Sequence, residues 1–262
     1  MTAGFRATDR AVLRLSGPDV RDFLQGLVTN DVRRLDVGLA YAALLSPQGK
    51  YLFDFILVPD GEDVLLDVKA DRAEALARRL ALYKLRAKVT IEPTDLAVVV
   101  GVGAPPPVAH PDPRDPELGW RAYGEAEALL AGMAPLDPDA AEARRIALGV
   151  PESGIELVAD DSYILEMGFE RLQGVDFRKG CYVGQEVTAR MKHKTELRKG
   201  LVRVRVRGAA PPPGTAIAGD GRIVGTLFSS ADGIGLAYLR FDRADGPMTA
   251  GDATVERIPD PA

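Results

Sequence analysis

Cysteine and histidine are almost absent from this chain. The 262 residues include one cysteine, Cys181, and two histidines, His110 and His193. One thiol cannot form an internal disulfide framework, nor can it supply a zinc site built on several thiolates. So few histidines also argue against a histidine-rich metal site. We therefore expect no resident metal, and we expect a reducing, cytoplasmic compartment.

The sequence also lacks long apolar runs and an excess of basic residues. No stretch of about eighteen apolar residues occurs, which predicts that the chain does not span a membrane. The first residues, Met1 to Arg6, contain no apolar signal region. The formal net charge of -5 differs from the basic footprint of a nucleic-acid-binding protein. We expect neither a membrane nor a nucleic acid as a partner.

The chain has instead the composition of an ordinary globular protein. Apolar residues make up 46% and charged residues 27% of it, which suits one large domain or two to three small ones. Strand and helix patterns do not alternate regularly, which favours an α+β fold over a doubly wound sheet. The predicted helices begin near residues 16, 71 and 137, and the predicted strands of the first part cover residues 10–15, 41–45, 51–58, 63–68, 89–92 and 96–102.

Proline and turn residues divide the chain into three parts. Residues 104–116 contain six prolines, which neither a central strand nor a helix interior accommodates, so this segment is expected to be a linker or a long surface loop. After Gly200, short strand patterns at even spacing predict a small antiparallel β-barrel. The expected parts are an N-terminal α+β part (1–103), a middle α+β part (104–198) and the barrel (199–262).

Two glycines bracket the only thiol, in the sequence Lys-Gly-Cys-Tyr-Val-Gly-Gln-Glu of residues 179–186. Apolar residues at helical spacing follow, so we expect Cys181 at or just before a helix N-terminus. There, with Lys179 and Arg178 beside it, its thiolate would be favoured, which suits a nucleophile, a redox sensor or a soft-metal ligand. The alternative is a buried, inert cysteine that fills a small gap.

Polar residues near this motif and in an early strand are further candidates. Glu186 and Arg190 have the i,i+4 spacing of a helical ion pair. Asp54 stands alone in an apolar strand and either faces solvent or points into a pocket. An iron–sulfur cluster takes about four ligands, so Cys181 can touch one only if a partner chain or a small thiol supplies the others.

Three motifs resemble the YgfZ family, which comprises folate-binding relatives of the glycine cleavage system T-protein. Residues 179–186 resemble its K-G-C-Y-x-G-Q-E signature. Residues 23–31 (F-L-Q-G-L-V-T-N-D) resemble its F-L-Q-G-x-x-T-N-D block, and residues 45–50 resemble its L-x-P-x-G-(K/R) hairpin. Residues 174–177, with His193 after the signature, are similar to the branch that includes mitochondrial iron–sulfur assembly factors.

The resemblance implies an α+β, three-domain, cloverleaf-like T-protein fold around a central hole that binds tetrahydrofolate or a derivative. It implies a monomeric accessory protein, not a conventional enzyme, that assists the assembly or repair of iron–sulfur proteins, [4Fe-4S] ones especially. Its partners would be folate and iron–sulfur client or assembly proteins. The implied catalytic set is Lys179, Cys181, Gln185 and Glu186. The implied folate-binding set is Asn30, Asp31, Asp54, Tyr182 and Arg190.

Two alternative functions stay open. The first is a folate-dependent aminomethyltransferase or one-carbon transferase, in which Asp54 would stabilise a developing cation near folate. Two departures weigh against it: the acidic pair of the T-protein reads Phe53-Asp54 here, and its G-Y-T-G-E stretch has no clear counterpart. The second is a thiol enzyme or redox sensor that uses Cys181 without folate.

Overall fold

A five-stranded sheet covered by two helices forms the first lobe of the molecule. The computed structural model describes residues 2–194, 196–244 and 246–259. In spatial order the strands of this sheet are β3 (Ala40–Leu45), β4 (Tyr51–Asp60), β5 (Asp63–Lys69), β2 (Arg10–Ser16) and β6 (Thr90–Pro93). The helices are α1 (Val20–Gln25) and α2 (Ala70–Lys84), and the 3-10 helix η1 (Val32–Asp36) precedes β3.

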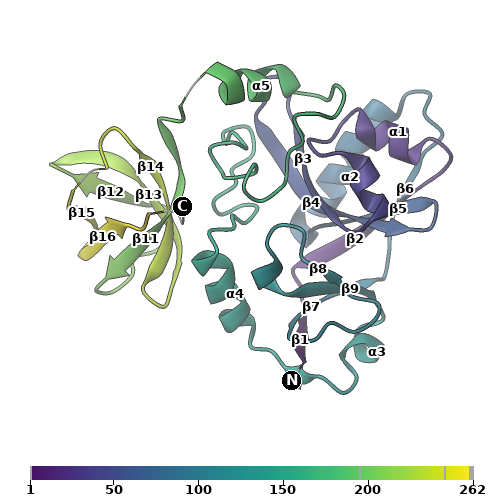
Figure 1. Ribbon diagram of the computed structural model, residues 1–262, viewed down its shortest axis with the longest axis horizontal. Helices are drawn as coiled ribbons and strands as arrows, with labels where there is room; N and C mark the ends of the chain where they lie inside the picture. The colour runs from purple at the N-terminus through teal and green to yellow at the C-terminus, as the bar shows by residue number, and fades with distance from the viewer. Residues whose placement is uncertain (1, 195, 245, 260–262) are drawn as a thin grey trace.

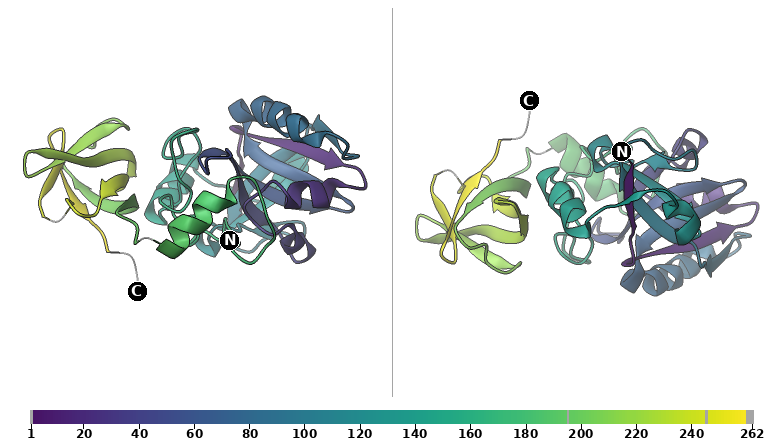
Figure 2. Two further views of the ribbon diagram at one scale, coloured as in Figure 1. Left: turned by 90° about the horizontal axis from the view of Figure 1, so that it is seen from above. Right: turned by 90° about the horizontal axis from the view of Figure 1, so that it is seen from below.

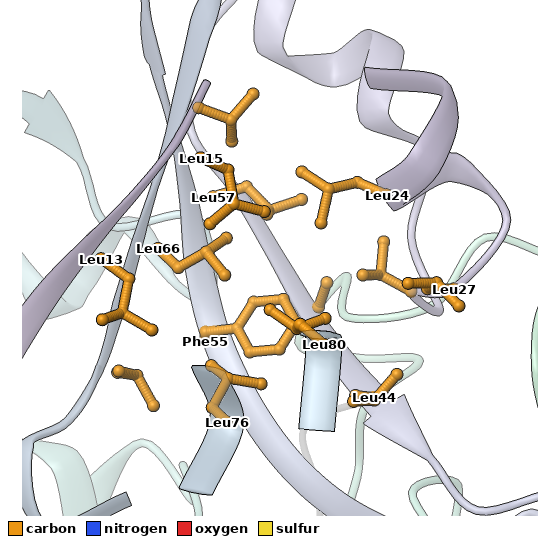
Figure 3. Packing of buried hydrophobic residues seen from close by; sticks show 14 of the residues in the cluster. Leu13, Leu15, Leu24, Leu27, Leu44, Phe55, Leu57, Leu66, Leu76 and Leu80 are labelled. Atoms are coloured by element: carbon orange, nitrogen blue, oxygen red, sulfur yellow. The ribbon is translucent and has the colours of Figure 1, made fainter. Parts of the chain in front are cut away.

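The central strands of this sheet are buried on both faces. On one face, leucines of the sheet pack against Leu76 and Leu80 of α2, which lie four residues apart and so share one side of the helix (Figure 3). On the other face, alternate residues such as Tyr41 and Ile56 enter a second core. This alternation places Asp54, two residues before Ile56, on the face of the second core rather than towards α2.

The second sheet takes strands from both sides of residue 103. In spatial order they are β10 (Ala134–Pro135), β1 (Ala3–Arg6), β7 (Ala97–Val102), β9 (Trp120–Gly124) and β8 (His110–Pro111). The proline-rich segment leaves this sheet after β7 and returns to it as the two-residue strand β8, and the 3-10 helix η2 (Pro116–Leu118) then leads into β9. The short helix α3 (Ala126–Leu130) follows β9. The division at residue 103 stays a prediction.

The middle of the chain joins the lobes with irregular backbone. Helix α4 (Pro138–Ala147) begins as predicted, with the Asp137 carboxylate accepting from Asp139 N and Pro138 in the first turn. Residues 148–184 then cross the second core, where Phe169 stacks on Tyr41 with ring centroids 4.8 Å apart. Helix α5 (Gln185–Lys194) follows and leads into the barrel.

The predicted C-terminal barrel is confirmed. Six antiparallel strands close in the order β11, β14, β13, β12, β15, β16 around a core of small and branched apolar residues. They are β11 (Lys199–Arg207), β12 (Thr215–Gly219), β13 (Arg222–Ala231), β14 (Ile234–Arg240), β15 (Met248–Ala250) and β16 (Ala253–Arg257). The alternation of valine and arginine along β11 places the valines inside and the arginines outside.

The three lobes lie around the irregular middle segment (Figure 1). The barrel occupies one end of the molecule and the α2 lobe the other, with α5 above the middle segment between them. Views from above and below show the same separation of the barrel from the two sheets (Figure 2). Within the described residues, no helix has the length and apolar character that a bilayer crossing requires.

Candidate functional site

Lys179 is the point at which the signature loop is attached to the N-terminal lobe. Its side chain is buried, and its ammonium donates to the carbonyl oxygens of Val28 and Asn30, at 2.9 Å for Asn30. Burial lowers the pKa of Lys179 to about 8, an effect that Asp31 and Asp176 oppose. Through these two hydrogen bonds Lys179 holds the signature loop against the backbone of the Thr-Asn-Asp block.

Thr29 and Asn30 complete this attachment. The Thr29 hydroxyl donates to Gly174 O at 2.6 Å, and the Asn30 amide donates to Gln173 O at 2.6 Å and to Tyr41 O at 2.7 Å. Both side chains are buried. The amide protons of Asn30 are thus used within the protein, so this residue holds the two segments together instead of presenting its amide to a ligand.

Asp31 has a local structural role as well. It caps η1 by accepting from Arg33 N at 3.0 Å, and it forms an ion pair with the Arg33 side chain at 2.6 Å. The hydrogen bond from Arg33 holds the pKa of Asp31 at about 2. The carboxylate of Asp31 therefore serves as the N-cap of η1.

The hairpin between β3 and β4 meets the signature loop at two glycines. Both Gly49 and Gly184 have positive φ, 75° and 82°. A Cβ on Gly184 would lie 2.6 Å from Ser46 O, and a Cβ on Gly49 would lie 2.7 Å from the Val187 Cβ. Only glycine permits both the backbone conformation and this close approach. The structure thus brings together the three motifs that the sequence singled out.

Cys181 is exposed at the outer side of this assembly. Helix α5 begins at Gln185, four residues later, so the thiol precedes the helix without lying in its first turn. The buried, inert alternative is therefore wrong. Tyr182, the next residue, is buried; its hydroxyl lacks a hydrogen-bond partner of ordinary geometry among the described residues, and burial raises its pKa to about 12.

The predicted pair on α5 is present. Arg190 and Glu186 form an i,i+4 ion pair at 2.7 Å, with 59% and 84% of their side chains exposed. In this position Arg190 is a surface residue of α5, and it does not line the cavity described below. Exposed i,i+4 pairs contribute only about 0.3–0.5 kcal/mol, so the pair supports the helix weakly.

Asp54 is buried and points towards the second core. Its carboxylate accepts from the Tyr51 hydroxyl at 2.8 Å and from the Tyr41 hydroxyl at 3.0 Å. The Tyr51 hydroxyl also lies 2.7 Å from Ser153 Oγ. Burial raises the pKa of Asp54, while Arg10 lowers it. Of the two alternatives that the sequence left open, the solvent-facing one is wrong.

A charged cavity of about 380 Å³ lies near Asp54, between β1, β9, α4 and the loop at Glu152. No motif of the sequence indicates this cavity. Its charged lining residues come from five separate segments of the chain: Arg6, Asp9, Arg10, Asp112, Arg114, Arg121, Asp139, Glu142, Arg145 and Glu152. Their spread over the sequence leaves no local motif that could have indicated the cavity.

Most of these charges are paired inside the protein. Asp112 accepts from both Arg114, at 2.8 Å, and Arg121, at 2.8 Å. Burial alone would raise the pKa of Asp112, but the two guanidinium groups hold it well below its ordinary value. Asp67 of β5 accepts from Arg10 at 2.6 Å and from Arg121 at 2.7 Å. The cavity therefore offers a polar wall whose charges are nearly balanced.

No group of three or more His, Cys, Asp or Glu side chains suited to hold a metal occurs in the described part of the chain. Cys181 is accordingly the single thiolate ligand that this chain can offer to a metal cluster. The predicted catalytic residues occupy different environments: Lys179 is buried, Cys181 and Glu186 are exposed, and Gln185 is half-buried at the start of α5.

Comparisons with known proteins agree with this architecture. Residues 198–261 match the family described as CAF17, C-terminal beta-barrel domain. The crystal structure of glycine cleavage system aminomethyltransferase T from Bartonella henselae is similar over 98% of this chain and 84% of that one, with a TM-score of 0.77 and 14% sequence identity. The expected T-protein fold is thus confirmed, and at this identity the likeness concerns the fold alone.

Relatives of known name are more similar in sequence. The human iron–sulfur cluster assembly factor IBA57, mitochondrial, is 33% identical over 94% of this chain and 80% of its own length. The corresponding homologue of Pyricularia oryzae is 32% identical over 92% of this chain and 72% of its own length. The mouse protein is 31% identical over 93% and 79%.

These names correct one expectation and settle the family. The expected cytoplasmic location is wrong, because the relatives are named mitochondrial. A lone cysteine could not distinguish the compartments, since a single thiol forms no internal disulfide in any of them. The specific relation to YgfZ stays a prediction. With identities of 32% and 33% over most of both chains, this chain belongs to the family of the iron–sulfur cluster assembly factor IBA57.

Proposed function

We propose that this protein assists the assembly or repair of iron–sulfur proteins, [4Fe-4S] ones especially, through Cys181. The names of its relatives support this role. The observation that carries it is the placement of the thiol: Cys181 is exposed on a loop that Lys179 and Gly184 hold rigidly against the N-terminal lobe. One thiolate supplies one of about four cluster ligands, so the cluster is cargo shared with a partner protein.

Complementation of a deletion strain tests this role. We expect Cys181→Ser to abolish recovery of [4Fe-4S] enzyme activity without changing the thermal midpoint, because the thiol is exposed. The matched control is Arg222→Ala, another exposed position, on the barrel. Full recovery by Cys181→Ser would contradict the proposal.

We further propose that tetrahydrofolate binds in the charged cavity. Its volume of about 380 Å³ lies within the range of small-molecule sites, about 300–1,000 Å³. The paired, balanced charges of its wall suit the donor and acceptor edge of a pterin better than a bare anion. Glu152 and Arg114 are positioned to contact such a ring, and Arg6, exposed among the lining residues, suits the glutamate end of folate. Bound tetrahydrofolate supplies one-carbon carrier chemistry.

Calorimetric titration with tetrahydrofolate tests this site. We expect Arg114→Ala to weaken binding by about tenfold or more, as expected when a charged partner is lost. Arg190→Ala, an exposed change on α5, should bind as wild type does. Unchanged binding in Arg114→Ala, or equal loss in Arg190→Ala, would contradict this placement.

Aminomethyl transfer is a second candidate because Asp54 is buried near the cavity, where the charges of Arg10 and Glu152 act on it. A buried carboxylate can stabilise a developing cation on a folate adduct. Formation of methylenetetrahydrofolate from an aminomethylated lipoyl carrier, lost in Asp54→Asn, is the expected result for this candidate. No product above the blank would contradict it.

A further inference from the structure

The end of α2 and the turn that follows it carry a local excess of positive charge. Residues 78–88 include five Lys and Arg and no Asp or Glu, in a chain whose net charge is -5. Helix α2 belongs to the lobe at the end of the molecule opposite the barrel (Figure 1), and it runs along one edge of this lobe in the views from above and below (Figure 2). This basic segment is therefore presented to the surroundings.

Within the described residues, four of these five cations form no ion pair, although the backbone N of Lys88 donates to the Asp19 carboxylate at 2.8 Å. Arg78 forms an ion pair with Glu74 one turn earlier on the helix. In the described part of the chain, Arg79, Lys84, Arg86 and Lys88 have no carboxylate within ion-pair distance. Cations that lie close together without ion-pair partners repel one another, and binding of an anionic partner relieves this repulsion.

Two leucines protrude among these cations. The exposed fraction of Leu82 is 71% and that of Leu85 is 91%, whereas Leu76 and Leu80 on the inner side of α2 are fully buried. Leu85 ends the helix with φ of 40°, a conformation that bulky residues rarely adopt. The neighbouring backbone keeps it there, because Ala87 N donates to Lys84 O at 2.7 Å and Val89 is buried in the core.

Protruding leucines flanked by unpaired cations match a lipid surface better than a protein. A stable protein interface buries about 800 Å² on each partner around a packed centre, and this short segment offers two separate side chains instead. A bilayer surface needs no complementary pocket. It accepts leucines at the level of the headgroups, and it attracts nearby Lys and Arg through its anionic lipids.

We propose that residues 78–88 form a docking surface for an anionic lipid bilayer. The leucines enter the interface and the cations contact the headgroups. The surface is separate from Cys181 and from the charged cavity, so this proposal does not depend on the proposed function.

Co-sedimentation with vesicles tests the docking surface on the full chain. We expect binding to vesicles of equal parts phosphatidylcholine and phosphatidylglycerol at low ionic strength, and none to phosphatidylcholine alone. Arg86→Glu with Lys88→Glu should weaken binding by more than about tenfold. Leu82→Ser with Leu85→Ser should retain binding at low salt and lose about tenfold or more at higher salt, where charges are screened.

The matched control is Arg205→Glu with Arg222→Glu, which makes the same change in net charge at exposed positions of the barrel. It should bind as wild type does apart from a small uniform decrease. Absence of binding to anionic vesicles at low salt would overturn the proposal. So would equal losses in the α2 and barrel variants, since these would show attraction by overall charge alone.

Discussion

Lys179 and Cys181, two residues apart in one motif, have different roles because one side chain is buried and the other is exposed. Lys179 points inward and bonds to the carbonyls of Val28 and Asn30, whereas Cys181 points outward. The sequence predicted that Lys179 would favour the thiolate of Cys181. The structure instead commits its ammonium to the backbone, which makes Lys179 a positioning residue for the loop that carries the thiol.

Because the ammonium of Lys179 is buried, the free energy of unfolding should change with pH in the alkaline range. Burial lowers its pKa from 10.5 to about 8, while the unfolded chain retains the proton to about pH 10. Between these values the unfolded state binds more protons, so stability rises with pH. Relative to Lys179→Met, the unfolding free energy of wild type should increase by about 1–2 kcal/mol over this range.

Urea unfolding at a series of pH values measures this difference. Lys192→Met is the control, because Lys192 is a more exposed lysine paired with Glu170. A difference between wild type and Lys179→Met that does not change with pH would contradict the burial of a charged lysine at this position.

At the scale of elements, the hairpin after β3 and the start of α5 hold each other in place. Gly184 lies against Ser46 O, and Gly49 lies against Val187. Each glycine has a positive φ, so each position is restricted by its own backbone as well as by its neighbour. The sequence showed glycines in both motifs, but it could not show that they face each other.

A pair of glycine substitutions within the signature separates this contact from the motif as a whole. Gly184→Ala should lower stability by about 2–3 kcal/mol, because the methyl group meets backbone at 2.6 Å in a positive-φ position. Gly180→Ala should change it by less than about 0.5 kcal/mol, since among the described residues no atom beyond its two chain neighbours lies within 4 Å of the new Cβ. Thermal unfolding compares the two; equal effects would contradict the close contact.

At the scale of the whole molecule, Glu156 joins the barrel to the middle segment. Its buried carboxylate accepts from Ser229 N of β13 at 3.1 Å and from Arg145 of α4 at 3.2 Å. Arg145 also donates to the Ser229 hydroxyl at 2.9 Å. Because buried charges without partners are costly, this cluster helps to fix the orientation of the barrel, together with hydrogen bonds such as that from Leu201 N to Glu166 O at 2.7 Å.

Removal of the Glu156 carboxylate should loosen the barrel. Glu156→Ala removes the acceptor of Ser229 N and of Glu152 N and one of the partners of Arg145, at a cost of about 2–4 kcal/mol. Hydrogen exchange of the amides in β13 should accelerate around Ser229. In Glu142→Ala, which removes the half-exposed partner of the same arginine, exchange there should stay near wild type. Equal exchange in the two variants would contradict the role of Glu156.

The sequence by itself determined the local elements and the importance of one motif. Alternating valine and arginine predicted the barrel strands, Asp137-Pro138 predicted the start of α4, and the spacing of Glu186 and Arg190 predicted their ion pair. These features depend on neighbours within a few residues, which is why periodicity and capping rules suffice for them. The resemblance of the signature likewise needed only contiguous residues.

Only the tertiary structure decided what each side chain faces. Asp54 turned inward because β3 and β4 are covered on both faces, and a strand sequence alone does not tell one face from the other. Asn30 and Lys179 join segments that lie about 150 residues apart in the chain. Asn30 donates to the carbonyl of Gln173, 143 residues away, and Lys179 donates to the carbonyl of Asn30, 149 residues away. The charged cavity takes its lining from residues between 5 and 152 that do not form one contiguous motif, so it exists only once these segments have packed.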